Sequence, residues 1–153
     1  MKDEWGEKGE RGKGEDESSQ FLFVYGTLRK HSGGDLYHVL ARNAAFVGDG
    51  TVQGRLYSLG EYPGLVLART PTDTVKGEVY RIAGLSLNEV LALLDEYEGC
   101  GQRDPEHHEY RRTIIPVRID NQNTIRAWAY VLNRDTQGLR RIHSGDFIGS
   151  RAS

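Results

Sequence analysis

Cysteine is almost absent from this sequence of 153 residues, which has Cys100 and no other. One thiol cannot form a disulfide within the chain, so nothing indicates an oxidising compartment or a cysteine-rich metal cluster. Long apolar runs are also lacking, and none approaches the roughly 20 residues that a membrane-spanning helix needs. The N-terminus lacks the basic-then-apolar order of a secretory signal. We therefore expect a soluble, cytoplasmic protein.

Neither sign of charge is in clear excess. The chain has 20 basic and 22 acidic side chains, and residues 1–17 hold four of the basic and seven of the acidic ones, which leaves 16 and 15 for the remainder. A body so close to neutral gives no reason to expect nucleic acid or an anionic membrane as a partner. We expect a small molecule or another protein, and the oligomeric state stays open.

Apolar side chains are scarce in the first twenty residues, which are charged and rich in glycine. Such a segment cannot bury enough surface to offset the entropy lost on ordering. We predict a disordered tail over residues 1–20, one folded domain over 21–148 and a short C-terminal tail over 149–153.

Short β-like runs separated by turn residues dominate the ordered part. Phe21–Val24 is continuously apolar, as expected of a strand buried on both faces. A short helix is predicted over 35–42, and residues 110–119 and 124–132 form a predicted hairpin. Further strands are predicted over 44–48, 51–58, 64–68 and 75–82. The sum is an α+β domain, either a small barrel or a strongly curled sheet.

A second predicted helix is better defined at both ends. Ser86 and Glu89 match a capping box, and Gly99 supplies the stop. Between them, leucines spaced by four and three residues form one apolar stripe that faces the core. These leucines are Leu87, Leu91 and Leu94.

Glu98 occupies the next position on this stripe. Burial and the negative end of the helix dipole both disfavour a carboxylate there, so we expect its pKa to lie above the usual value of about 4.3. A carboxyl group with a raised pKa is suited to acid–base chemistry. The residues alone leave open that the helix end frays and Glu98 points into water. Asp95 and Glu96 are expected to be solvated.

A second candidate site is the turn Tyr25–Arg29, which follows the first buried strand. A glycine at this place allows a tight turn whose backbone N–H groups point inward and bind a carboxylate or phosphate. The turn lacks the Lys-Ser/Thr ending of a P-loop, so nucleotide binding is not implied. A plain strand-ending turn is the alternative.

Other groups of polar residues give weaker signals. His107–His108 is not expected to bind a metal, because adjacent residues of an extended segment point to opposite faces. Cys100 shows no activating partner. Arg111–Arg112 and Arg140–Arg141 are expected to be surface charge, and no serine-hydrolase elbow surrounds Ser144–Asp146.

Seven short motifs follow one another along the chain. They are Val24–Arg29, Gly54–Tyr57, Tyr62–Gly64, Gly77–Tyr80, Leu94–Gly99, Tyr110–Arg112 and Ser144–Asp146. In this order they resemble the motifs of the gamma-glutamylcyclotransferase-like superfamily. The resemblance covers Phe21 to Phe147 and is greatest to the gamma-glutamylamine cyclotransferase and bacterial small-domain branches. Phe147 stands where a tryptophan often follows Gly-Asp, and the polar residues 100–109 have no clear counterpart.

This resemblance implies an α+β fold, a small mixed β-barrel with flanking helices. It also implies conversion of a gamma-glutamyl amine or amide to 5-oxoproline plus free amine, an activity classed among the lyases and the acyltransferases. Glu98 would be the general base, and Tyr25, Gly26, Thr27 and Leu28 would hold the substrate. Because the substrate's own alpha-amine attacks its gamma-carbonyl, the reaction needs no enzyme nucleophile, metal or organic cofactor.

Two other functions are compatible with the same fold. One is a non-catalytic module that binds a metabolite or a protein, although an acid that faces the core costs stability unless it has a task. The other is a gamma-glutamyl deprotecting enzyme of a biosynthetic pathway, which differs only in the amine released.

Overall fold

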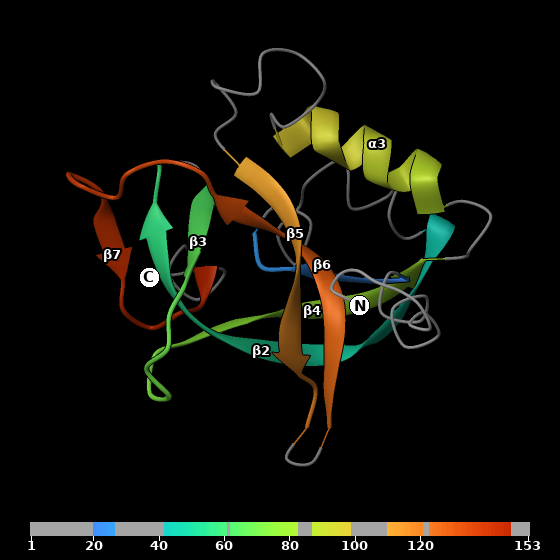
Figure 1. Cartoon of the computed structure of the whole chain (residues 1–153), viewed down its shortest axis with the longest axis horizontal. Coiled ribbons are helices and arrows are strands. Elements are labelled where there is room, and N and C mark those ends of the chain that lie inside the picture. The colour runs from blue at the N-terminus through green and yellow to red at the C-terminus, as the bar shows by residue number, and fades with distance from the viewer. Residues whose placement is uncertain are drawn as a thin grey trace, which may run out of the picture.

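A computed structural model describes residues 20–26, 42–60, 62–82, 87–98, 110–120 and 123–147, with the side chains of the helix described as far as Asp95. Seven strands and one helix lie in these ranges (Figure 1). In chain order they are β1 (Phe21–Val24), β2 (Ala44–Ser58), β3 (Pro63–Leu67), β4 (Thr74–Ile82), α3 (Leu87–Glu98), β5 (Tyr110–Arg118), β6 (Thr124–Leu132) and β7 (Arg140–Ile142).

Five of the strands close into a barrel in the order β1-β4-β2-β3-β6, with β6 pairing back to β1. The pairs β1–β4, β4–β2 and β2–β3 are antiparallel, whereas β3–β6 and β6–β1 are parallel. Outside this ring β5 forms a hairpin with β6, and β7 lies on the second half of β2. Helix α3 lies across one side of the barrel (Figure 1). The predicted α+β mixed barrel is therefore confirmed.

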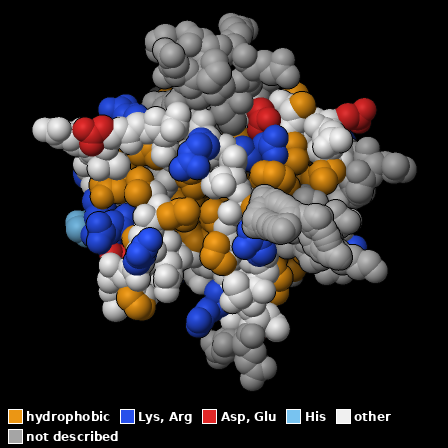
Figure 2. All heavy atoms as spheres, viewed as in Figure 1, with side chains coloured by type: hydrophobic (Ala, Val, Ile, Leu, Met, Phe, Trp, Pro, Cys, Tyr) orange, Lys and Arg blue, Asp and Glu red, His pale blue; other side chains and the backbone are white. Residues whose placement is uncertain are grey.

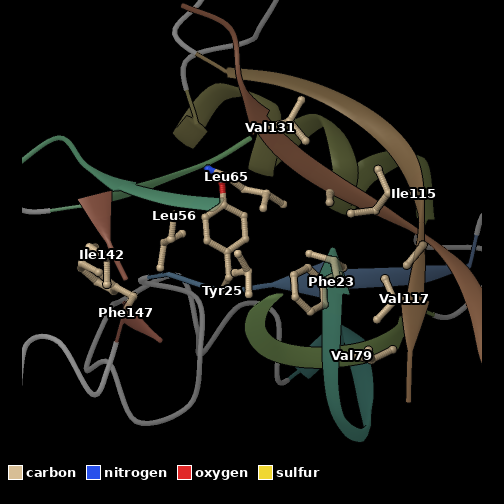
Figure 3. Packing of buried hydrophobic residues seen from close by; sticks show 14 residues of the cluster. Phe23, Tyr25, Leu56, Leu65, Val79, Ile115, Val117, Val131, Ile142 and Phe147 are labelled. Atoms are coloured by element: carbon tan, nitrogen blue, oxygen red, sulfur yellow. Dashed lines mark hydrogen bonds between the residues drawn. The ribbon is translucent and has the colours of Figure 1, made fainter. Parts of the chain in front are cut away.

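Strand alternation divides the buried side chains between two cores. The inner core fills the barrel and includes Phe23, Tyr25, Leu65 and Val79 (Figure 3). The outer core lies between the sheet and α3. Its members are Leu22, Val24, Tyr80, Ile82, Val90, Leu91, Leu94, Tyr110, Tyr130 and Leu132. The leucine stripe of the helix thus faces the core, as predicted, and β1 is buried on both faces.

Strand β2 corrects one prediction, because residues 44–48 and 51–58 belong to a single strand. Its pairing with β4 shifts register between Phe46 and Gly48, where one extra residue makes a bulge. Gly50, which was expected in a turn between two strands, instead allows close packing within β2. A Cβ on Gly50 would lie 2.8 Å from Cγ1 of Val117.

Several predicted features lie wholly or partly outside the described residues. This holds for residues 1–19, for the helix predicted over 35–42 except at Arg42, and for Ser86 and Gly99 beside α3. Gln20, which we placed in the tail, accepts a backbone hydrogen bond of 2.7 Å from the N–H of Ile82. Gln20 is therefore joined to the sheet, although it was placed in the tail. Strand β7 was not predicted.

The described surface is mixed in character. Lys and Arg side chains lie between apolar ones on the face shown in Figure 2. Two exposed apolar side chains, Phe46 and Val47, belong to the first half of β2. In the described part of the chain, no helix has the length and apolar character that crossing a membrane requires.

Candidate active site

The predicted site residues lie at the ends of two elements that share the outer core. Tyr25 and Gly26 follow β1, and Glu98 is the last residue of α3. Leu94 of α3 and Val24 of β1 are both buried in the outer core, so the structure brings these two elements together. Thr27 and Leu28 lie outside the described residues, as does the side chain of Glu98.

Tyr25 directs its side chain into the barrel (Figure 3). Its hydroxyl donates a hydrogen bond to the backbone carbonyl of Tyr130 and accepts one of 3.1 Å from the N–H of Leu65. The ring is buried, and its hydroxyl satisfies polar backbone groups of β3 and β6. A contact between Tyr25 and a substrate would therefore have to come from its backbone.

Gly26 packs directly against Pro63, the first residue of β3. A Cβ on Gly26 would lie 3.0 Å from Cγ and 3.1 Å from Cδ of Pro63. The carbonyl of Pro63 accepts a hydrogen bond from the hydroxyl of Tyr110, at the start of β5. Three motifs that are far apart in the sequence thus meet at the end of β1. Any side chain at position 26 would press on a rigid ring.

Asp95 fastens the last turn of α3 to the β5–β6 hairpin. Its Oδ1 accepts hydrogen bonds from Nε of Arg112 at 2.8 Å and from the hydroxyl of Tyr130 at 2.7 Å, and Oδ2 accepts one from Arg112 at 3.2 Å. Arg112 also lies 4.5 Å above the ring of Trp128. The expectation that Asp95 is solvated was wrong, because a cation and a hydroxyl from the sheet reach it.

In each of the two arginine dipeptides, one side chain is exposed and the other forms an ion pair. Arg111 and Arg140 are exposed, as predicted, whereas Arg112 and Arg141 are half-buried in ion pairs. In each pair the two residues are neighbours on a strand, so alternation points them to opposite faces. Sequence reasoning treated each pair as one unit and so missed this difference.

Glu78 is a buried carboxylate that the sequence reasoning did not single out. Only 2% of its surface is exposed, and its Oε1 accepts a hydrogen bond of 3.0 Å from the hydroxyl of Tyr80. It lies opposite Val24 in the β1–β4 register. Strand alternation gave a usable signal, because Glu78 is in phase with Tyr80 and Ile82 of the outer core.

A second ion-pair cluster involves none of these site residues. The Asp73 carboxylate pairs with Arg55 at 2.9 Å and with Arg141 at 3.0 Å. Hydrogen bonds from Arg55 and then from Arg141 lower the pKa of Asp73 below its usual 3.8. In turn, Asp73 raises the pKa of Arg55. The cluster joins the segment before β4 to β2 and β7.

Comparison with known proteins identifies the family. Residues 22–149 match the family described as Gamma-glutamyl cyclotransferase, AIG2-like. The chain is 38% identical over 128 residues to the gamma-glutamylcyclotransferase family protein YtfP of Escherichia coli strain K12, which covers 83% of this chain and 95% of that protein. This chain therefore belongs to the gamma-glutamyl cyclotransferase, AIG2-like family.

Solved structures show the same fold. The solution structure of Escherichia coli YtfP superposes with a TM-score of 0.55 at 36% sequence identity, covering 86% of this chain and 98% of that one. A crystal structure of an AIG2-like protein from mouse gives a TM-score of 0.55 at 23% identity, over 84% and 94% of the two chains. The family resemblance expected from the motifs is confirmed.

Proposed function

We propose that this protein is a cytoplasmic cyclotransferase that converts a gamma-glutamyl amine or amide to 5-oxoproline and a free amine. Family membership supports a cyclotransferase activity in general terms. The observation that carries the proposal is the shared outer core of β1 and α3, in which Val24 and Leu94 are buried together. Val24 directly precedes the turn after β1, and Leu94 lies about one helical turn before Glu98, the last residue of α3.

The proposed reaction is an internal acyl transfer. The substrate's alpha-nitrogen forms a bond to its own gamma-carbonyl carbon, and the bond from that carbon to the departing amine breaks. Before attack the alpha-ammonium must lose a proton, and Glu98 would accept it. Protonated Glu98 would then donate its proton to the departing nitrogen. As the lactam forms, the alpha-nitrogen must lose a second proton, which the regenerated Glu98 carboxylate would accept and pass to the released amine to give its ammonium form. The protein must also hold the substrate curled, with amine and carbonyl in contact.

The turn after β1 is the proposed holder of the substrate's alpha-carboxylate. Backbone N–H groups of residues 25–28 would bind the carboxylate and leave the gamma arm free to fold back toward Glu98. The side chain of Tyr25 faces the barrel interior, which is consistent with a role for the backbone of this turn. The proposed chemistry requires no metal and no organic cofactor.

The test is the substitution Glu98→Gln, assayed by 5-oxoproline release from a panel of gamma-glutamyl compounds. Glutamine keeps the size and hydrogen-bonding reach of glutamate but cannot accept the ammonium proton. We expect a folded variant that still binds 5-oxoproline and whose kcat is about 10²–10⁴-fold lower. The matched control is Glu96→Gln in the same helical turn, which should keep the parental kcat.

Two outcomes would contradict the proposal in different ways. Parental turnover by Glu98→Gln would remove Glu98 from the mechanism. A parent that binds 5-oxoproline but converts none of the panel would instead indicate a non-catalytic binding module. The compound converted most efficiently identifies the amine that is released, and so separates general gamma-glutamylamine turnover from removal of a protecting group in a biosynthetic pathway.

A further inference from the structure

The last turn of α3 is electrostatically unfavourable when it is considered alone. It includes the acidic Asp95 and contains no basic residue. The C-terminal end of a helix carries partial negative charge, which repels a carboxylate and attracts a cation. Here Arg112 of β5 supplies the cation through its two hydrogen bonds to Asp95. The sheet therefore stabilises this helix end through the carboxylate of Asp95.

Tyr130 connects that helix end to the turn after β1. Its hydroxyl donates to Asp95 at 2.7 Å, and its backbone carbonyl accepts the hydrogen bond from the hydroxyl of Tyr25. Tyr130 also lies directly opposite Arg112 in the β5–β6 register, so both side chains leave the sheet on the face covered by α3. One residue of β6 thus holds Tyr25 inside the barrel and Asp95 outside it.

We propose that Asp95, held by Tyr130 and Arg112, is a positioning residue that places Glu98 relative to the turn Tyr25–Gly26. This inference rests on the proposed function of Glu98. Asp95 precedes Glu98 by three residues, so both belong to one helical turn. Three hydrogen bonds on one carboxylate, two of them from a planar guanidinium, restrict both sliding and rotation of that turn. A shift of about 1 Å in a catalytic group can cost as much as 10²-fold in rate.

The inference is tested with Asp95→Ala and Tyr130→Phe, assayed for kcat, for KM and for 5-oxoproline affinity. Alanine favours the helix more than aspartate does, so a loss of activity would not follow from weaker helix propensity. We expect kcat to fall about 10- to 100-fold in Asp95→Ala and less in Tyr130→Phe. KM and 5-oxoproline affinity should stay at parental values, because the turn after β1 is unchanged.

Matched variants separate positioning from a general loss of stability. Asp73→Ala also removes a carboxylate that accepts hydrogen bonds from two arginines, but outside the candidate site, and should keep the parental kcat. Arg112→Lys should retain part of the kcat that Arg112→Ala loses, because lysine keeps the charge without the two-pronged hydrogen bond. In a double-mutant cycle, Tyr130→Phe should add no further loss to Asp95→Ala.

The outcomes distinguish this inference from the proposed function. An active parent with parental kcat in folded Asp95→Ala would overturn the inference and leave the proposed function intact. An equal fall of kcat in Asp73→Ala would overturn it too, because any lost ion pair would then have the same effect. Should Asp95→Ala fail to fold, Tyr130→Phe, which loses one hydroxyl, decides by the same criteria. A parent inactive on every gamma-glutamyl compound would refute the proposed function and, with it, the inference.

Discussion

At the scale of single residues, Gly26 shows why the turn after β1 requires glycine. The position lies against Pro63, and a Cβ there would be 3.0 Å from Cγ of the ring, tighter than an ordinary van der Waals contact. Pro63 is itself buried, and its carbonyl accepts the hydrogen bond from Tyr110. The glycine therefore serves packing at this end of the barrel, whatever its backbone contributes to a ligand.

We predict that Gly26→Ala displaces Pro63 slightly and lowers the free energy of unfolding by about 1 kcal/mol. The same displacement should weaken 5-oxoproline binding, because the proposed carboxylate-binding turn begins here. Urea unfolding and calorimetric titration measure the two effects. Gly26→Val should lower both the free energy of unfolding and the affinity for 5-oxoproline further than Gly26→Ala does. Parental affinity for 5-oxoproline in folded Gly26→Ala would remove this turn from the proposed substrate site.

Gly145 is constrained more strongly than Gly26, both by its backbone conformation and by its neighbours. Its φ is +71°, and a Cβ there would collide with the carbonyl oxygen of Thr74. We predict that Gly145→Ala lowers the free energy of unfolding by about 2–4 kcal/mol, the sum of backbone strain and overpacking. Gly138→Ala is the control, because its φ is +84° with nothing within 4 Å of a Cβ, and it should cost about 1 kcal/mol. Equal losses in the two variants would contradict the role of Thr74.

At the scale of elements, Asp73 links the segment before β4 to β2 and β7 through ion pairs with Arg55 and Arg141. Its lowered pKa means that folding favours the ionised carboxylate. The resulting stabilisation is present above the usual pKa of 3.8 and is lost as the pH falls through the lower pKa of the folded state. Part of the acid sensitivity of the fold should therefore come from Asp73.

We predict that Asp73→Asn is less stable than the parent at neutral pH and that the difference narrows as the pH falls below about 4. Because an amide does not titrate, the variant should also lose less stability than the parent on acidification. Thermal unfolding over a pH series measures this. A difference between the two proteins that stays constant down to pH 2 would show that the ion pairs do not stabilise the fold. High salt should reduce the difference at neutral pH, because both ion pairs are partly exposed.

At the scale of the whole molecule, Gln20 is joined to the barrel, because its carbonyl accepts a hydrogen bond from the N–H of Ile82. We predict that deletion of residues 2–19 leaves the Tm and any turnover unchanged, because this charged segment has few apolar side chains to bury. Deletion through Phe23 is the contrasting control, since it removes Leu22 and Phe23 from the two cores and should prevent folding. A lower Tm in the shorter deletion would show that the tail contributes to the domain.

The elements that the sequence predicted well are those whose signal is local. Phe21–Val24 was recognisable as a strand because its apolar run is short and continuous, and the leucines of α3 were recognisable from their helical spacing. The β5–β6 hairpin was predicted to within a residue. Strand β7 is three residues long and exists through its pairing with β2, so its own sequence carried little signal. Gly50 of β2 was misread as part of a turn because close packing and turns can require the same residue.

The candidate site likewise combines features that a local sequence signal predicts with features that depend on contacts between distant residues. The motifs around Tyr25 and Glu98 identified the family from the sequence, because each motif is a contiguous string of residues. The sequence by itself therefore determined the family, the main strands, the leucine stripe of α3 and the position of Glu98 at its end. The tertiary structure alone decided that the Tyr25 side chain faces the barrel, that Gly26 lies on Pro63 and that Asp95 is held by Arg112 and Tyr130. The physical reason is that these contacts join residues distant in sequence, and only closure of the barrel brings them within hydrogen-bonding or van der Waals reach.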